Sequence, residues 1–318
     1  MVQTSDINKI NRLIDKANNI YIMGHRYIDL DAIASSAGIY HLAKSKNKKA
    51  SIIINDKKLE VSSKKLINEM FKSYRIINSN EIKNINDDDL LIIVDTNKEA
   101  LLQDKTLFQK INNVIIIDHH DYNDECIKKG LVIIDEETSS ACEMITEILL
   151  HNNFEIVPNL ATILLSGIVL DTNNFVLKTG ANTYKMAYEL TTRGAKPLYV
   201  QYLLKQNLKD YVARQKAITN IKKIKNVAIS CTSQRVTYRR EDLAKISDTL
   251  LQFNGIEASF VIGKLDNGNI GISARSMGKI DVGKILENFD GGGDNHEAGA
   301  SIENSTTKEI EKKIRMFL

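Results

Sequence analysis

The stretch IMGHRYIDLDAIAS, residues 22–35, decides how the first half of this chain is interpreted. It begins at the end of an apolar run and then places His25, Asp29 and Asp31 within seven residues. Carboxylates crowded at a strand tip repel one another unless they are paired, solvated or neutralised by a cation. The stretch therefore predicts a strand that ends at a charged site and is followed by a helix with small residues on its early turns.

Apolar runs rich in Ile and Val recur through the first half of the chain. They cover residues 19–23, 50–55, 90–96, 113–120 and 131–136, and helix-like segments lie between or after them. Runs that are apolar at nearly every position are typical of strands buried on both faces, as in a parallel sheet. The alternation of strands and helices predicts an α/β layered domain.

The second half has a different pattern. Residues 182–225 are helical in periodicity and more polar, and NLKDYVARQKAITNIKKIK (207–225) is typical of a long exposed connecting helix. Strand candidates follow at 226–232, 257–265 and 269–276, then a helix-like DVGKILENF (281–289), a glycine turn DGGGDNHEAGAS (290–301) and a last helix. A second, smaller domain is therefore expected after the connecting helix.

Acidic and imidazole side chains follow several of the predicted strands. The run that begins at residue 90 ends in Asp95, the next ends in Asp118, His119 and His120, and an apolar helix ends at Asp171. In an open parallel sheet, ligands bind beyond the carboxyl ends of the strands, so these groups should share one rim with the residues of the first run. Taken alone, Asp95 or Asp171 would be explained as a helix cap or turn residue.

The composition of this rim favours a metal site over four separate structural roles. Carboxylates with a minority of imidazoles suit Mn²⁺ or Mg²⁺, whereas sets of only His or Cys suit zinc. The number of ligands is sufficient for two ions that share one carboxylate. Two such ions clamp a phosphoryl group and generate a hydroxide nucleophile.

Composition limits the other classes of function. The net charge of +3 and the 6% of aromatic residues do not predict a groove for a long nucleic-acid strand. The three cysteines are widely spaced, which suits a reducing cytosol. Neither a signal peptide nor a membrane-spanning run is visible, so we expect a cytoplasmic chain without membrane contact of its own, either complete or cut from an anchored protein.

Four motifs resemble those of the DHH phosphoesterase family. GHRYIDLDA (24–32) is similar to its first motif, VDTN (94–97) to the second, DHH (118–120) to the third and GIVLDTNNF (167–175) to the fourth. The second half resembles the companion DHHA1 module through ISARS (272–276), DVGKI (281–285) and the GGG turn (291–293). The resemblance spans nearly the whole chain and is strongest to the GdpP-type cyclic-di-AMP phosphodiesterases, which usually carry further segments ahead of this module.

The resemblance implies a fold and domain boundaries. It implies a parallel-sheet DHH catalytic domain with helices on both faces over residues 1–183. A helical linker over 184–225 would join it to a smaller α+β DHHA1 domain, with a mixed sheet, over 226–318.

The resemblance also implies roles for the residues of the rim. One metal ion would be held by His25, Asp29 and Asp95. A second would be held by Asp31, Asp95, His119 and Asp171, which makes Asp95 the bridging ligand. Asp118 and His120 would lie outside the ligands, and Asp118 would orient an imidazole. His120 would be catalytic through contact with the substrate phosphate, or it would make only a structural hydrogen bond.

In the second domain, the resemblance implies contacts to substrate. These would come from Ser273, Arg275, Ser276, Gly291, Gly292, Gly293 and His296. A guanidinium fork matches phosphate oxygens, and glycines permit close approach of backbone N–H groups to an anion. The family turn normally reads GGGH, but here Asp294 follows the glycines and His296 comes two residues later. We expect one of two outcomes. Either His296 takes over the role of the usual histidine through a shifted loop, or the second domain binds substrate more weakly or with a different substrate preference.

The sequence therefore predicts a two-metal phosphodiesterase that opens cyclic di-AMP to linear pApA, with Mn²⁺ as cofactor and Mg²⁺ or Co²⁺ as alternatives. The rival enzyme is a nanoRNase or pAp phosphatase acting on short linear nucleotides. A non-catalytic sensor and a single-strand exonuclease are the other readings that remain. The expected partner is a small nucleotide, and a homodimer is the default assembly.

Overall fold

The structure, a computed structural model, describes residues 2–56, 59–205 and 207–318. The chain divides into two compact units, residues 1–205 and residues 206–318. Each unit has its own sheet and its own apolar core. Within the described ranges, no helix has the length and apolar character needed to cross a membrane.

The first unit is built on a six-stranded sheet in the order β3-β2-β1-β4-β5-β6, in which all neighbours are parallel. The strands are β1 (Asn19–Met23), β2 (Lys49–Ile53), β3 (Ile76–Ile77), β4 (Leu90–Val94), β5 (Asn113–Asp118) and β6 (Leu131–Ile134). Five of these match the apolar runs of the sequence. The two-residue β3 is too short to leave such a run.

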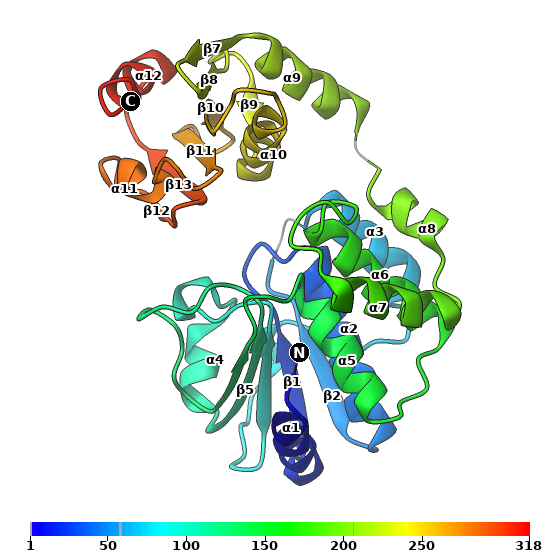
Figure 1. The fold of residues 1–318 in the computed structure, drawn as a ribbon. Coiled ribbons are helices and arrows are strands. Elements are labelled where there is room, and N and C mark those ends of the chain that lie inside the picture. The colour runs from blue at the N-terminus through cyan, green and yellow to red at the C-terminus, as the bar shows by residue number, and fades with distance from the viewer. Residues whose placement is uncertain (1, 57–58, 206) are drawn as a thin grey trace. The chain divides into compact units, whose positions relative to one another are not determined.

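Both faces of this sheet are covered, which explains why its strands are continuously apolar. In β1, Ile20 and Ile22 face one core, and Tyr21 and Met23 face the other. The larger core lies under the helices α2 (Leu30–Ser45), α5 (Ala141–His151) and α6 (Pro158–Asp171), whereas α4 (Lys105–Lys110) covers the opposite face (Figure 1). The predicted α/β class with helices on both faces is confirmed.

The remaining helical elements complete the first unit. They are α1 (Thr4–Lys16), α3 (Val61–Met70), α7 (Ala181–Thr192), α8 (Pro197–Leu203) and the 3-10 turns η1 (Ser79–Glu81) and η2 (Glu99–Leu101). Helix α2 is buried along most of its length because it packs against both α5 and α6. Its small residues, among them Ala34, Ala37 and Gly38, allow this close packing.

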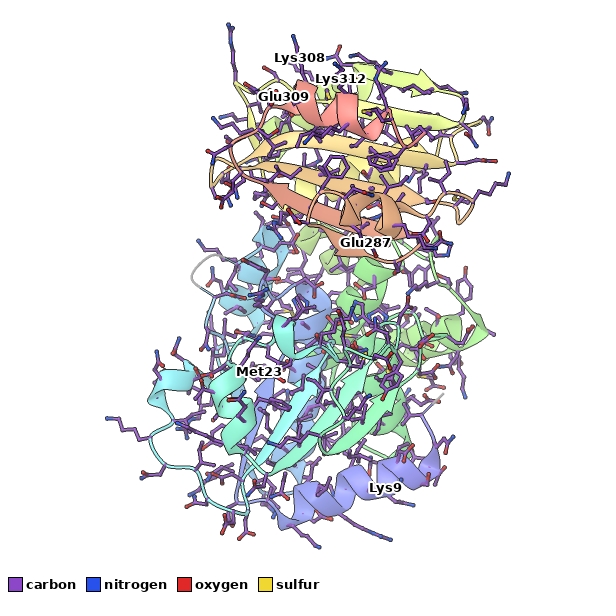
Figure 2. The ribbon with its side chains drawn as sticks, turned by 90° about the vertical axis from the view of Figure 1, so that its left-hand side faces the viewer. Lys9, Met23, Glu287, Lys308, Glu309 and Lys312 are labelled. Carbon is purple, nitrogen blue, oxygen red and sulfur yellow. The ribbon has the colours of Figure 1, made fainter. Side chains whose placement is uncertain are left out.

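The second unit has a mixed sheet in the order β12-β13-β11-β10-β8-β7, with β9 beside β10. Its strands are β7 (Ile221–Ile224), β8 (Val227–Cys231), β9 (Thr237–Tyr238), β10 (Ala258–Leu265), β11 (Ile270–Ser276), β12 (Gly292–Gly293) and β13 (Glu297–Ile302). Its helices are α9 (Leu208–Thr219), α10 (Arg240–Leu251), α11 (Val282–Glu287) and α12 (Thr307–Ile314). Lys308 and Lys312 project outward from α12 (Figure 2).

Two elements of the second unit differ from the sequence expectation. The segment read as a glycine turn contains β12 and β13, and β13 pairs with β11 over six residues. The small residues Ala298, Gly299 and Ala300 carry little intrinsic strand preference, so the pairing decides this strand. The expected long helix over 207–225 ends at Thr219, and β7 then pairs antiparallel with β8.

The segment 184–225, expected as a linker, is shared between the two units. Helices α7 and α8 pack on α6, and α9 packs on α10. The boundary between compact units therefore falls after Lys205. The assignment of a catalytic domain to residues 1–183 and a substrate domain to 226–318 stays a prediction.

The close packing of α2 on α5 makes Gly38 a test of this core. A methyl group at Gly38 would lie 2.3 Å from Cγ2 of Ile145, which is far inside contact distance. We predict that Gly38→Ala lowers the free energy of unfolding by about 1–3 kcal/mol, the range for overpacked cores, despite the better helix propensity of Ala. Urea unfolding followed by circular dichroism measures this. Gly180→Ala is the control, because a methyl group there meets nothing within 4 Å, and equal stability of the two variants would contradict the packing.

Candidate metal centre

The acidic and imidazole side chains of the first unit meet at the carboxyl ends of β1, β4 and β5. The strand order places β1 beside β4, and the chain leaves these two strands toward opposite edges of the sheet. Such a switch point creates a crevice beyond the strand ends, where ligands of open α/β sheets bind. The loops after these strands carry the first three motifs, and α6 supplies the fourth at its last residue, Asp171.

Asp95 lies at the centre of the cluster and is 1% exposed. It directly follows β4 and has a φ of 59°. Its backbone N–H still donates to the carbonyl oxygen of Ile117 in β5, at 3.0 Å, so the chain turns while Asp95 remains hydrogen-bonded to the sheet. Its Oδ2 lies 3.5 Å from His25 Nε2, and its Oδ1 lies 3.2 Å from His119 Nε2. One carboxylate thus faces the imidazoles of two different loops. Burial would raise the pKa of Asp95, but the nearby imidazoles of His119 and His25 outweigh it and lower that pKa.

His25 and Asp29 form one side of the cluster. Nδ1 of His25 lies 2.8 Å from the carbonyl oxygen of Arg26, which can only accept a hydrogen bond, so Nδ1 carries a proton. Nε2 therefore faces the carboxylates of Asp29, at 3.6 Å, and Asp95. Asp29 also caps α2, because its Oδ1 accepts from the N–H of Ala32 at 3.0 Å.

Asp31 is fully buried on the first turn of α2 and is held by the N-terminus of α5. Its two carboxylate oxygens accept hydrogen bonds from the N–H groups of Ala141, at 2.7 Å, and Cys142, at 3.0 Å. Both the N–H groups and the helix dipole favour the anion there. Gly167 of α6 leaves room for this contact, since a methyl group on it would lie 2.4 Å from Asp31 Oδ1 and 2.4 Å from Cys142 Sγ.

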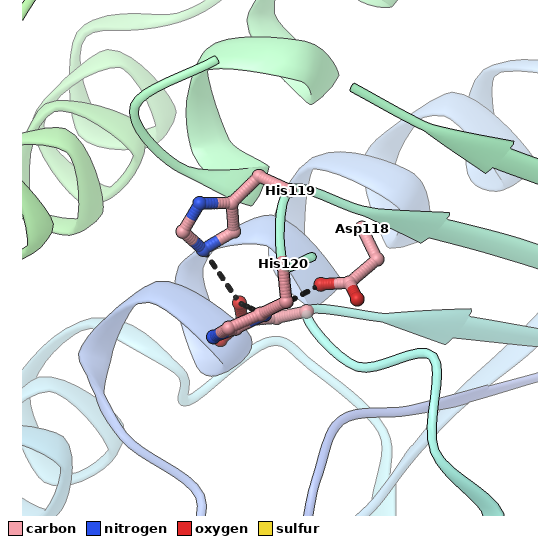
Figure 3. A group of neighbouring side chains, drawn as sticks. Asp118, His119 and His120 are labelled. Carbon is pink, nitrogen blue, oxygen red and sulfur yellow. Dashed lines mark hydrogen bonds and ion pairs between the residues drawn. The ribbon is translucent and has the colours of Figure 1, made fainter. Parts of the chain in front are cut away.

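His119 and His120 approach from the end of β5. His119 is buried, and its Nε2 lies 3.2 Å from Asp171 Oδ2 as well as 3.2 Å from Asp95 Oδ1. His120 is more exposed, and its Nδ1 lies 2.8 Å from Asp118 Oδ1 (Figure 3). Asp118 itself is fully buried, and its contact with Nδ1 sets the orientation of the His120 ring.

Three overlapping groups have ligand atoms within 4.8 Å of one another. One contains His25, Asp29 and Asp95; the second Asp31, Asp95, His119 and Asp171; the third Asp95, Asp118, His119 and His120. Asp95 belongs to all three. The first two groups contain the same residues as the two ligand sets that the resemblance to the DHH family implies.

The chemistry of these donors fits divalent cations. Asp95 Oδ1, Asp118 Oδ2 and both ring nitrogens of His119 are buried without a hydrogen-bond partner among the described residues. Leaving buried polar atoms unsatisfied is costly, and four in one cluster indicate that the site is built for a group that binds them. Oxygen-rich ligands with a few imidazoles suit Mn²⁺ and related divalent ions.

Burial and the neighbouring charges raise the pKa values of several members of the cluster, in contrast to Asp95. Burial raises the pKa of Asp171 to about 6 and raises the pKa of Asp31 well above its usual value. Burial would lower the pKa of His25, but Asp29 and Asp95 outweigh it and raise that pKa to about 12. Protons on the imidazoles therefore compensate for the buried carboxylates, and a divalent ion would take their place.

The second unit has a pocket of about 580 Å³ beside β11 and β13. Five of the seven predicted substrate contacts line it: Ser273, Arg275, Gly291, Gly292 and Gly293. Ser276 and His296 are not among its lining residues. They contact one another in the adjacent turn instead, where His296 Nδ1 lies 3.2 Å from the carbonyl oxygen of Ser276.

The structure explains why Asp294 replaces the usual histidine of the glycine turn without strain. Its Oδ1 accepts hydrogen bonds from the N–H groups of His296, at 2.7 Å, and Glu297, at 2.8 Å. Asp294 therefore serves the turn between β12 and β13, and its charge is directed at the backbone.

Sequence reasoning missed the groups that hold the cluster in place. The N-terminus of α5 could have been found, because Ser140 and Glu143 have the spacing of a helix start, and Ser140 does cap α5. Asn97 is 1% exposed and donates from Nδ2 to the carbonyl oxygens of His120, at 3.3 Å, and Asp121, at 3.4 Å. It ties the second motif to the third. Only the fold reveals the role of Gly167.

Comparisons with known proteins agree with this architecture. The model of the DHH family, N-terminal domain, matches residues 19–168, and the model of the DHHA1 domain matches residues 225–318. The two matches cover both units and all the clustered residues except Asp171.

Similar proteins include named phosphodiesterases. The chain is 34% identical over 319 residues to the cyclic-di-AMP phosphodiesterase PdeA of Listeria monocytogenes, and the match covers 96% of this chain but 48% of that protein. This chain thus spans about half the length of that relative. It is 26% identical to the bifunctional oligoribonuclease and PAP phosphatase NrnA of Mycoplasma genitalium, covering 95% of this chain and 94% of NrnA.

The fold also has a close counterpart among solved structures. An exopolyphosphatase-related protein from Bacteroides fragilis superposes with a TM-score of 0.83 at 21% identity, covering all of this chain and 97% of that one. At this identity the likeness concerns the fold alone. With both family models matched and the motif residues gathered at one switch point, the chain belongs to the DHH family and carries a DHHA1 domain.

Proposed function

We propose that this chain is a metal-dependent phosphodiesterase that hydrolyses cyclic di-AMP to linear pApA. The observation that carries the proposal is the convergence of four motifs on Asp95, with buried donor atoms left unsatisfied around it. The similarity to PdeA along nearly the whole chain supports the cyclic substrate. Hydrolysis adds one water across a P–O3′ bond, leaving a 3′-hydroxyl and a 5′-phosphate.

Two Mn²⁺ ions are the proposed cofactor. One would be held by His25, Asp29 and Asp95, and the other by Asp31, Asp95, His119 and Asp171. Bound there, the ions would supply Lewis acidity for the scissile phosphate and lower the pKa of the attacking water. Hydrogen bonds position the side chains at this site. The N-terminus of α5 binds the carboxylate of Asp31, and Asp118 orients the ring of His120.

His120 is the proposed contact to the reacting phosphate. Its side chain is 55% exposed, whereas that of the neighbouring His119 is 7% exposed. The carboxylate of Asp118 outweighs the effect of burial and raises the pKa of His120. A histidine held by a carboxylate in this way favours the charged form that binds a phosphate oxygen and can donate a proton.

Substrate recognition would also use the pocket of the second unit. Arg275 offers a guanidinium fork, and Gly291, Gly292 and Gly293 keep the backbone accessible. Ser273 lines the same pocket, while Ser276 and His296 would act through the turn beside it. These assignments rest on the match of ISARS and GGG to the family motifs.

The second candidate is a hydrolase for short linear nucleotides such as pApA or pAp. NrnA matches this chain over almost its own full length, which PdeA does not. The cluster of proposed metal ligands suits either reaction, because both reactions cleave a phosphate ester. Only the shape of the preferred substrate separates them.

A panel of substrates decides between the two candidates. Cyclic di-AMP, pApA and pAp are each incubated with the chain and Mn²⁺, and products are identified by liquid chromatography and mass spectrometry. We expect the highest kcat/KM for cyclic di-AMP and accumulation of pApA. A preference for pApA or pAp would establish the linear-nucleotide function instead.

Replacement of Asp95 tests the shared ligand. Asp95→Asn keeps the size of the side chain but removes the charge that both ion sites use, so we expect turnover to fall to background and Mn²⁺ binding in calorimetry to be lost. Circular dichroism should show a folded protein. Asp121→Asn is the matched control, since Asp121 is exposed and lies outside the three groups. An active Asp95→Asn protein would refute the metal centre.

Gly167 tests how Asp31 is positioned. We predict that Gly167→Ala weakens Mn²⁺ binding by roughly 10- to 100-fold, the usual effect of disturbing groups that orient metal ligands, because the methyl group displaces Asp31. Gly38→Ala overpacks the same helix α2 against Ile145 and should leave the affinity for Mn²⁺ intact while lowering stability. Equal Mn²⁺ affinities in the two variants would show that Gly167 matters only for packing.

A further inference from the structure

The guanidinium of Arg275 already contacts two carboxylates of the second unit. Its Nε donates to Asp248 Oδ1 at 2.7 Å, and its NH2 lies 3.2 Å from Glu297 Oε2. NH1 donates to the carbonyl oxygen of Ala274 at 3.1 Å. The side chain of Arg275 is only 16% exposed, and each of its guanidinium nitrogens already has a partner. A phosphate must therefore displace one of these partners to bind Arg275.

The two carboxylates are held very differently. Asp248 makes a short, aligned hydrogen bond to Nε from helix α10, and its side chain is 40% exposed. Glu297 is 63% exposed, and within the described part of the chain its carboxylate pairs with Arg275 alone. An exposed ion pair contributes little stability, so Glu297 is the partner that a ligand can displace.

The register of the sheet keeps Glu297 at this position. Arg275 of β11 and Glu297 of β13 are direct cross-strand partners, so the carboxylate sits opposite the guanidinium whenever β13 is formed. Glu297 also lines the pocket of about 580 Å³ together with Arg275 and the glycines. Anions entering the pocket therefore meet a carboxylate at the place where they would bind.

We propose that Glu297 is an intramolecular competitor for the phosphate that Arg275 binds. The inference rests on the proposed function, which assigns substrate phosphate to this pocket. Binding then exchanges one anion for another on the guanidinium: Glu297 swings toward solvent while Asp248 keeps Arg275 in place. The exchange disfavours ligands without a phosphate, because they cannot replace the carboxylate, and it sets the affinity for nucleotides below what a free arginine would give.

Binding of 5′-AMP and adenosine to the metal-free chain of 318 residues tests the competition. Glu297→Gln removes the competing charge and keeps the size of the side chain. We expect the Kd for 5′-AMP, measured by calorimetry, to fall about two- to fivefold, the range of an exposed ion pair. The Kd for adenosine should stay the same.

Glu241→Gln is the matched control for a general electrostatic effect. Glu241 lines the same pocket but pairs with Arg239, at 2.9 Å, so its removal lowers the local negative charge without freeing Arg275. The proposal requires a gain for Glu297→Gln that Glu241→Gln does not show. Equal gains in the two variants, unchanged or undetectable binding of 5′-AMP to Glu297→Gln, or weaker binding would each overturn it.

Kinetics separate this proposal from the proposed function. With Mn²⁺ and the hydrolysed substrate, Glu297→Gln should lower KM and leave kcat unchanged, since Glu297 lies outside the metal cluster. If no nucleotide of the panel is hydrolysed but the 5′-AMP gain appears, the proposed function fails and the competition stands. If turnover occurs without that gain, only the competition is refuted.

Discussion

The fold of the first unit depends on accommodating buried negative charge around Asp95. Five aspartates, at positions 29, 31, 95, 118 and 171, lie in the three overlapping groups, and Asp31, Asp95 and Asp118 are almost fully buried. Such groups repel strongly in an apolar interior unless cations or hydrogen-bond donors compensate for them. The protein supplies part of the compensation through His25, His119 and the N-terminus of α5. The buried oxygen and nitrogen atoms left without a hydrogen-bond partner fit a site for a divalent cation.

The parallel sheet makes this concentration of charge possible. Its strands are apolar on both faces, so polar groups are confined to the loops at the strand ends. Neighbouring parallel strands bring these loops together, and the reversal of strand order between β1 and β4 opens space between them. The helices have a second task, because the dipole and the N–H groups at the N-terminus of α5 bind the carboxylate of Asp31.

The sequence was sufficient for features that leave a local pattern. The continuous Ile and Val runs predicted β1, β2, β4, β5 and β6, and the polar residues directly after them predicted which side chains meet at the rim. It was insufficient where a neighbour decides the outcome. β13 contains Ala298, Gly299 and Ala300, and its pairing with β11 makes it a strand. Gly167 looks like any helical glycine until α2 and α5 are placed against it.

The departure at Asp294 shows how a sequence difference can mislead when it is considered at one position. An aspartate after the glycines suggests repulsion of a phosphate, yet its carboxylate is bound to the N–H groups of His296 and Glu297. The turn that it stabilises begins β13 at Glu297, and the register of β13 then sets Glu297 opposite Arg275. The carboxylate that pairs with Arg275 therefore belongs to a residue three positions further along the chain than Asp294. Asp294 thus shapes the backbone turn that leads into β13 and sets Glu297 beside Arg275.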